Sequence, residues 1–387
     1  MNVTGRIVIA GAGLGGLTAA LALQKAGFRP LVLEQAEVLG DVGAGISITP
    51  NAAKGLISLG LGEALDANAQ APMQQLVRDG LSGEQLMCID RSTVRERYGA
   101  AYYMMHRADL HALLVAAVLA NDSGAIRTGH KLAGVAIERG QARIDVMGSP
   151  SIRTDVLIAA DGARSLIRTA LFGDDGARFT GHVAWRLLVP AEAAPEAARQ
   201  PGSVVWTGTE RSFVRYGVRG GSLVNCVGLT RTGQWRGEGW SQQVPVADMA
   251  AEYDGWVSEV TGLISAAPGG LVNSWGLFVR PAAERLVAGP VALLGDAGHP
   301  MLPFMGQGAA MAIEDGVVLG RCFAESASSA EALVRYEAAR LERTRFIQAE
   351  SAAGAERLQQ AGPGKERLAR NEDSLGIFDY DPAIVPV

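Results

Sequence analysis

Three glycines and one glutamate near the start of the chain have the types and spacing needed to bind a dinucleotide. Gly11, Gly13 and Gly16 follow the apolar run Arg6–Ala10, and Glu34 comes 18 residues after Gly16. Such glycines allow a tight turn, a close approach of the backbone to a pyrophosphate, and close helix–strand packing. A carboxylate at this distance accepts hydrogen bonds from ribose hydroxyls and repels a 2′-phosphate, which favours FAD or NAD over NADP.

The elements around these residues must form a parallel α/β sheet. A strand at Arg6–Ala10, a helix at Leu14–Ala26 and a strand at Leu31–Glu34 are predicted from apolar spacing and from the turns between them. Further strands are expected at Asp155–Ala160 and Leu286–Leu294, and helices at Ala108–Ala120, Gly306–Phe323 and Ala330–Gln360. The tail from Gly362 is polar, and we expect it to be loose.

Short alternating strands in the middle of the chain predict a second, antiparallel sheet. They are expected at Ser203–Gly208, Phe213–Val218 and Leu223–Leu229, and residues 219–222 form a turn between the last two. A small part of this sheet is expected to come from Pro72–Tyr98. Alternation places Val214, Tyr216 and Val218 on one face of their strand and Arg215 on the other.

The composition indicates a globular protein with no basic surface. The 387 residues are 48% hydrophobic and 19% charged, with a net charge of −5, so nucleic acid is not an expected partner. Cys88, Cys226 and Cys322 lack metal spacing and suggest reduced thiols in the cytoplasm, and the five histidines show no ligand spacing. The run Ala112–Ala120 has nine residues, short of the roughly 20 that cross a membrane. Because the first strand begins at Arg6, we expect no signal peptide ahead of it.

Two later motifs extend the fingerprint into a resemblance to a known family. The run 155–162 ends in Asp161-Gly162, and Gly295-Asp296 opens the run 295–300. Together with the glycine turn, these motifs resemble the single-component (class A) FAD-dependent aromatic hydroxylases. Within that family, several stretches look like salicylate hydroxylase, 3-hydroxybenzoate 6-hydroxylase and 6-hydroxynicotinate 3-monooxygenase: residues 43–46, 50–52, 106–111 and 300–303.

The resemblance covers the chain to about Arg345 and implies an α/β (α+β) fold like that of p-hydroxybenzoate hydroxylase. It implies a discontinuous Rossmann-like FAD-binding domain (1–71, 99–175, 278–328), an inserted antiparallel-sheet substrate domain (72–98, 176–277) and a C-terminal helix and tail (329–387). NADH or NADPH would bind transiently and reduce FAD. Oxygen would then form a flavin C4a-hydroperoxide, which hydroxylates a phenolic or N-heteroaromatic acid. A monomer or homodimer is expected.

The resemblance also assigns residues to the cofactor. Asp296 would bind a ribitol or ribose hydroxyl, Asp161 would link the FAD and NAD(P)H sites, and the helix beginning at Gly306 would stabilise negative charge on reduced flavin. Arg164 and Arg168 either hold the end of the sheet or attract the nicotinamide cofactor. The implied cofactor-binding residues are Gly11, Gly13, Leu14, Gly16, Glu34, Gln35, Ser47, Arg107, Leu132, Asp161, Asp296, Gly306, Gly308 and Ala309. Relatives commonly carry Asn where this chain has Ala310, which removes one side-chain contact.

Catalysis is expected to involve Tyr216 and Pro303. Tyr216 would orient the substrate hydroxyl or accept its proton, and Pro303 would form a dry wall beside flavin C4a. Ser212 and Ser47 stand where some relatives carry His, so the usual histidine base is absent. The implied pocket residues are Tyr102, Trp185, Trp206, Tyr216 and Phe304.

Two other functions are compatible with these residues. The missing histidines also fit a flavin monooxygenase or epoxidase that acts on a non-aromatic or larger natural product. A flavin-binding regulatory protein with little turnover is a third reading, which the proline loop and the complete helix motif disfavour.

Overall fold

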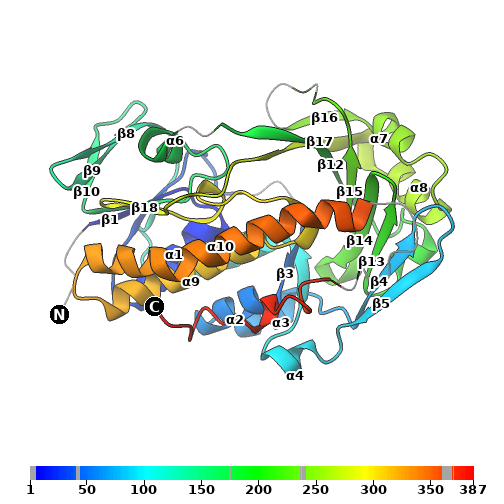
Figure 1. The fold of residues 1–387 in the computed structure, drawn as a ribbon, viewed down its shortest axis with the longest axis horizontal. Coiled ribbons are helices and arrows are strands. Elements are labelled where there is room, and N and C mark those ends of the chain that lie inside the picture. The colour runs from blue at the N-terminus through cyan, green and yellow to red at the C-terminus, as the bar shows by residue number, and fades with distance from the viewer. Residues whose placement is uncertain are drawn as a thin grey trace.

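The computed structural model shows an elongated molecule in which two sheet regions lie toward opposite ends, with long helices running along the molecule (Figure 1). It describes residues 6–40, 44–173, 176–235, 237, 241–359, 368 and 370–387. Gly43, Gln360 and Gly362, on which parts of the sequence-based prediction fall, lie outside these residues.

A six-stranded sheet forms the nucleotide-binding region, as the sequence predicts. Its order is β18-β19-β11-β1-β2-β7, and all neighbours are parallel except β18 and β19. The strands are β1 (Ile7–Ala10), β2 (Leu31–Leu33), β7 (Ile126–Arg127), β11 (Val156–Ala159), β18 (Val287–Ala288) and β19 (Val291–Leu293). Together with the antiparallel sheet described below, it confirms the mixed α/β fold class.

Two helices from opposite ends of the chain pack closely beside this sheet. They are α1 (Leu14–Lys25) and α9 (Gly308–Glu325). A Cβ on Gly316 would lie 2.7 Å from the backbone nitrogen of Ala19, and one on Gly320 would lie 2.6 Å from Cβ of Ala22. Only glycine allows so close an approach. The region also holds α5 (Arg107–Asn121), α6 (Leu166–Phe172) and a three-stranded sheet of β8 (Leu132–Glu138), β9 (Gln141–Val146) and β10 (Ile152–Thr154).

An eight-stranded sheet forms the other end of the molecule. Its order is β16-β17-β12-β15-β14-β13-β4-β5, and β13 and β4 are its only parallel neighbours. The strands are β4 (Gln74–Asp79), β5 (Gln85–Asp90), β12 (Arg178–Pro190), β13 (Ser203–Gly208), β14 (Arg211–Val218), β15 (Leu223–Arg231), β16 (Ser241–Pro245) and β17 (Leu271–Val279). The hairpin of β14 and β15 is confirmed. The domain boundaries given above stay a prediction.

The two faces of this sheet have different neighbours. The back face packs on α7 (Val246–Glu252) and α8 (Ser258–Ser265) in one apolar cluster. The front face packs on a 3-10 turn at Pro303–Met305 and on α10 (Ser329–Gln359). A small ladder of β3 (Gly45–Ile48) and β6 (Tyr103–His106), with α2 (Pro50–Ser58), α3 (Gly62–Asn68) and α4 (Val94–Tyr98), lies beside the front face.

Two expectations about the last third of the chain are wrong. The segment Leu286–Leu294 is a hairpin of β18 and β19 rather than one strand, because the chain reverses at Gly289, where φ is +55°. The described part of the tail is also not loose. Ile377 and Phe378 are fully buried, and Nζ of Lys54 donates a hydrogen bond to the Phe378 carbonyl oxygen over 2.9 Å.

No helix in the described part of the chain is both long and apolar enough to cross a membrane. The same residues contain no group of three or more His, Cys, Asp or Glu side chains that could hold a metal ion. Cys88 is exposed, Cys226 and Cys322 are buried, and all three are free thiols.

Candidate active site

The glycine-rich turn after β1 is so tight that two of its glycines have no room for a side chain. A Cβ on Gly11, whose φ is +106°, would lie 2.4 Å from the carbonyl oxygen of Ala160. A Cβ on Gly16 would lie 2.1 Å from the carbonyl oxygen of Gly11. Gly13 differs, since its Cβ would meet no atom within 4 Å. No side chain caps α1, which starts at Leu14, so its first N–H groups and its dipole are available to a phosphate.

Glu34 follows β2 and faces the glycine turn. Its carboxylate accepts hydrogen bonds from the backbone N–H groups of Ala12 and Ala36, each over 2.9 Å. On the other side, Nε2 of His111 lies 2.8 Å from the Ala12 carbonyl oxygen. These contacts fix Glu34 beside the open backbone at Gly13. The sequence assigned no role to His111, although a polar side chain between apolar helix positions was a signal for one.

Gln35 and Leu132 lie close to Glu34 along the backbone. Gln35 is the next residue and is exposed. Leu132 begins β8, which is brought to the end of β2 by a hydrogen bond from the His130 N–H to the Glu34 carbonyl oxygen over 2.8 Å.

The Asp161-Gly162 turn lies directly against the glycine turn, because Ala160 contacts Gly11. Oδ2 of Asp161 accepts a hydrogen bond from the Ile167 N–H over 3.3 Å. Oδ1 is buried and has no hydrogen-bond partner within the described part of the chain, and burial raises the pKa of this carboxyl. A buried oxygen without a partner, such as Oδ1 of Asp161, is suited to accept a hydrogen bond from a bound ligand.

Arg168 holds the end of the sheet, which is one of the two roles left open for it. Its side chain is buried and donates hydrogen bonds to the carbonyl oxygens of Gly298 and Pro281 over 2.7 and 3.1 Å. These contacts connect α6 to the segment after β19 and to the segment before β18. Arg164 is exposed.

Asp296 lies in a 3-10 turn that follows β19. The residue is exposed in surface area, yet the protein around it raises the pKa of its carboxyl by desolvation. Interactions with His299 and Arg107 act in the opposite direction. The Asp296 carboxylate is enclosed by protein and still accessible, so it lies in a crevice. Because Arg107, at the start of α5, interacts with this carboxylate, the structure brings Arg107 to the same crevice.

The N-terminus of α9 lies next to this crevice. The chain turns at Gly306, where φ is +63°, and a Cβ there would lie 3.8 Å from Cβ of Ser47. A Cβ on Gly308 would lie 4.0 Å from Oδ1 of Asp296. No side chain caps this helix, so its first N–H groups, around Ala309, are oriented toward the same region.

These features together fit FAD. The open backbone at the start of α1 and the carboxylate of Glu34 suit a pyrophosphate and a ribose. Asp161 and Asp296 offer acceptors to hydroxyl groups, and the N-terminus of α9 offers donors to an electron-rich ring.

Two buried tyrosines and the half-buried Ser47 form a hydroxyl cluster between β3 and the front face of the eight-stranded sheet. Tyr102 and Tyr216 are 6% and 5% exposed, and burial raises the pKa of both phenols, while hydrogen bonding to the Ser47 hydroxyl lowers it. Asn225 holds β3 in place by accepting a hydrogen bond from the Gly45 N–H over 2.6 Å. The cluster therefore unites Tyr216 and Tyr102, two of the predicted pocket residues, with Ser47.

The prediction that Trp185 and Trp206 line the pocket is wrong. Trp206 pairs with Phe213 and Trp185 pairs with Gly228, positions that put both indoles on the back face with α7 and α8. Successive side chains along a strand point to opposite faces. Tyr216 is an odd number of positions from Phe213 in β14, so Tyr216 points to the front face while Phe213 and Trp206 point to the back.

The expected direction of Arg215 is confirmed. Arg215 points to the back face, where it donates a hydrogen bond to the Gln200 carbonyl oxygen over 2.7 Å. Phe304 remains on the front side. Its ring lies edge-on to His182 with centroids 5.4 Å apart, and it follows Pro303 in the turn before α9.

A buried ionic network supports the turn that carries Asp296, and the sequence did not reveal it. Asp315 in α9 accepts a hydrogen bond from the Gly295 N–H over 2.9 Å, and its carboxylate lies 2.6 Å from Nε2 of His299 and 2.7 Å from Nε of Arg340. Burial alone would raise the pKa of Asp315, but its interactions with His299 and Arg340 lower it to about 2.

A second set of buried contacts fixes the N-terminus of α9. Nδ2 of Asn51 donates hydrogen bonds to Glu314 over 2.6 Å and to Oε1 of Gln307 over 3.1 Å. Nε2 of Gln307 donates to the Thr49 hydroxyl over 3.3 Å. Since Thr49 follows β3, these bonds connect the end of β3 and the start of α2 to the start of α9.

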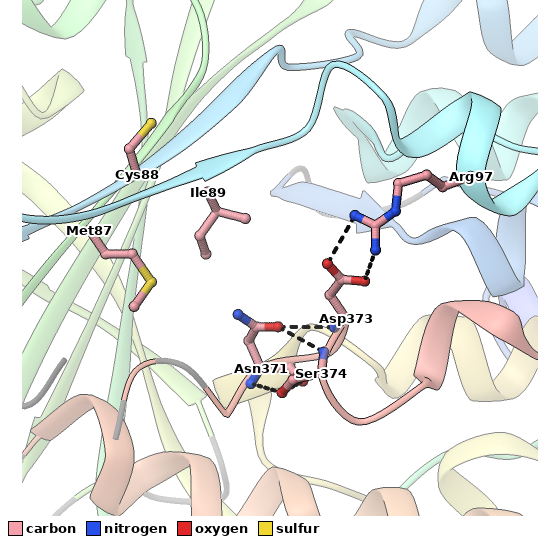
Figure 2. Close-up of a pocket in the computed structure, with 7 residues that line it drawn as sticks. All are labelled: Met87, Cys88, Ile89, Arg97, Asn371, Asp373 and Ser374. Carbon is pink, nitrogen blue, oxygen red and sulfur yellow. Dashed lines mark hydrogen bonds and ion pairs between the residues drawn. The ribbon is translucent and has the colours of Figure 1, made fainter. Parts of the chain in front are cut away.

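A surface pocket of about 460 Å³ lies elsewhere, between β5 and the tail (Figure 2). Its lining includes none of the predicted site residues: Met87, Cys88, Ile89, Arg97, Asn371, Asp373 and Ser374. Arg97 and Asp373 close one side with an ion pair of 3.0 Å.

Comparison with known proteins agrees with this site. Residues 5–351 match the model of the FAD binding domain family. The chain is 35% identical to 3-hydroxybenzoate 6-hydroxylase 1 of Aquipseudomonas alcaligenes (97% of this chain, 94% of the relative). It is 33% identical to 6-hydroxynicotinate 3-monooxygenase of Bordetella bronchiseptica (99% and 97%). The crystal structure of Klebsiella pneumoniae HpxO with FAD and uric acid superposes with a TM-score of 0.84 at 26% identity (97% and 96%).

The protein therefore belongs to the FAD binding domain family of flavoproteins. Within that family it is an FAD-dependent monooxygenase, as its resemblance to the class A aromatic hydroxylases implied.

Proposed function

We propose that the protein hydroxylates a phenolic or N-heteroaromatic acid, using NAD(P)H and O2. The observation that carries this proposal is the hydroxyl cluster of Tyr102, Ser47 and Tyr216, which lies between the apolar sheet face and the start of α9. The full-length similarity to a hydroxybenzoate hydroxylase and a hydroxynicotinate monooxygenase supports the same class of substrate.

The cluster suits a phenol or a hydroxypyridine. A tyrosine phenol is neutral near pH 7 and can both donate and accept a hydrogen bond, and burial of Tyr216 raises its pKa further from that range. Ser47 connects it to Tyr102, which gives a short hydroxyl relay in the absence of a histidine. A substrate hydroxyl held by Tyr216 becomes more electron-donating as its proton is shared, and this favours attack on the ring by an electrophilic oxygen.

The neighbouring segments exclude water and stabilise charge. Leu302 and Phe304 flank Pro303 and are buried, so this turn forms an apolar wall. The N–H groups that begin α9 stabilise negative charge nearby. FAD, when bound, supplies the electron transfer from NAD(P)H to O2 and the delivery of one oxygen atom. The balance is substrate, NAD(P)H, H+ and O2 giving hydroxylated product, NAD(P)+ and H2O.

NADH or NADPH binds transiently, and the protein acts as a monomer or homodimer in the cytoplasm. Three free cysteines support a reducing compartment.

The test uses the purified FAD-loaded protein. NADH and NADPH oxidation is followed with a panel of hydroxybenzoates, aminohydroxybenzoates and hydroxynicotinates, and products are analysed by mass. We expect at least one compound to stimulate oxidation and to gain one oxygen atom. If no aromatic compound does both, the proposal is wrong.

A further inference from the structure

Arg186 lies on the same face of the eight-stranded sheet as the hydroxyl cluster. It pairs with Val227 in β15, and Val227 pairs with Val214 in β14. Val214 is two residues from Tyr216, so both point to the front face. Arg186 therefore occupies the row of front-face residues next to Tyr216.

The charge of Arg186 acts on the space that holds the cluster. It lowers the pKa of Tyr216, opposing the larger effect of burial. The guanidinium lies over the indole of Trp275, 5.7 Å from the ring centroid, and the residue is half-buried. Its cross-strand neighbour Val227 and the next front-face residue on its own strand, Leu188, are apolar. Partial burial among apolar groups strengthens the attraction of a cation for an anion.

A buried amide beside Arg186 offers a second donor. Asn225 is fully buried, and it is the diagonal neighbour of Arg186 on the adjacent strand, since it pairs with Leu188. Diagonal neighbours are close enough for long side chains to meet. Oδ1 of Asn225 accepts the Gly45 N–H, whereas Nδ2 is buried and has no hydrogen-bond partner among the described residues. A buried donor of this kind is unfavourable unless a ligand accepts its hydrogen bond.

We propose that Arg186 and Nδ2 of Asn225 bind the carboxylate of the aromatic substrate and thereby select anionic rings. A carboxylate has acceptor positions enough for both donors, and a guanidinium matches its planar geometry. With the carboxylate held there, the ring lies along the apolar front face and its hydroxyl meets Tyr216. This inference rests on the proposed function, because it assumes an aromatic substrate at this site.

The test compares matched acids and amides. Binding of 3-hydroxybenzoate, 4-hydroxybenzoate, salicylate and 6-hydroxynicotinate, and of their carboxamides, is measured by perturbation of the flavin spectrum in the FAD-loaded protein. We expect the wild type to prefer the acids. Arg186→Met is expected to weaken acid binding by about 10- to 100-fold and amide binding by less than about twofold. Arg186→Lys, which keeps the charge, should retain part of the preference.

Two further variants sharpen the comparison. Asn225→Asp keeps the oxygen that accepts the Gly45 N–H but replaces the free donor by a negative charge, so it should weaken acid binding more than amide binding. Arg178→Met, at the exposed start of β12, removes a charge outside the site and should change neither. FAD content and thermal stability show whether each variant folds.

The outcomes separate the two proposals. If a phenol is hydroxylated but Arg186→Met leaves the acid-to-amide ratio unchanged, the carboxylate assignment is wrong and the proposed function stands. If acids do not bind better than amides in the wild type, the assignment is also wrong. If no acid or amide binds or is hydroxylated, both proposals fail.

Discussion

Nδ2 of Asn51 donates a hydrogen bond of 2.6 Å to Oε1 of Glu314, across 263 positions of sequence. Both side chains are fully buried, and the same Asn51 amide reaches Gln307 at the start of α9. This pair therefore fixes the distance between the first helix after β3 and the helix that faces the proposed flavin ring.

Asn51→Ala is expected to lower the free energy of unfolding of the FAD-free protein by about 1–3 kcal/mol, because it leaves buried acceptors without their donor. FAD affinity should fall as well, since the N-terminus of α9 loses its hydrogen bonds to α2. Urea unfolding and FAD titration measure the two effects. Asn121→Ala, on the exposed end of α5, is the control and should change neither. An unaltered FAD affinity in Asn51→Ala would show that the contact does not position the helix.

Asp315→Asn removes the negative charge between His299 and Arg340. Because Arg340 is fully buried, the loss of one partner is expected to cost about 3–5 kcal/mol of stability at pH 7. The folded-state pKa of about 2 lies below the ordinary 3.8, so the charged form contributes stability above about pH 4 and loses it as the pH falls toward 2. The stability difference between wild type and variant, measured by urea unfolding, should narrow over that interval. A difference that is constant with pH would contradict the assignment.

Gly11 and Gly13 should respond differently to the same substitution. Gly13 has a φ of −72° and open space where a Cβ would lie, so Gly13→Ala is expected to change the free energy of unfolding by less than about 0.5 kcal/mol. It should still weaken FAD binding, because the methyl group enters the space proposed for the pyrophosphate. Gly11→Ala should destabilise the fold itself by about 1–3 kcal/mol. Equal FAD affinity in wild type and Gly13→Ala would place the pyrophosphate elsewhere.

Tyr216→Phe is expected to reduce the rate of substrate hydroxylation by about 100-fold or more, because it removes the group that shares the substrate proton. FAD content should be unchanged, and NAD(P)H oxidation should continue with release of hydrogen peroxide. Ser47→Ala should show a smaller effect in the same direction. Product formation and peroxide release are measured together. A variant that hydroxylates at the wild-type rate would remove Tyr216 from the mechanism.

The local sequence pattern was sufficient to predict much of the fold. The order β1, α1, β2 follows from apolar spacing and one glycine turn, and β13 has the predicted bounds, Ser203–Gly208. These elements depend on neighbours a few residues away, so the sequence around them contains the needed information.

The face of the antiparallel sheet to which a side chain points depends on how the strands pair, and the sequence of a single strand does not determine that pairing. The sequence predicts Trp206 in the pocket, yet the turn after β13 aligns Gly208 with Arg211 and therefore Trp206 with Phe213, on the back face. The network of Asp315, His299 and Arg340 depends on contacts between segments far apart in the chain, and its charged residues look in sequence like ordinary solvated positions. Polar side chains that are buried together cannot be recognised before the helices are packed.

The contact between Gly316 and Gly320 of α9 and Ala19 and Ala22 of α1 has a consequence for building chimeras with relatives. The surfaces of the two helices are complementary in shape. Any side chain larger than hydrogen at Gly316 or Gly320 would collide with α1. A crossover between residues 26 and 307 would pair an α1 from one parent with an α9 from another. Such hybrids should assemble only when both parents have equally small residues at these four positions, so the two helices are best inherited together.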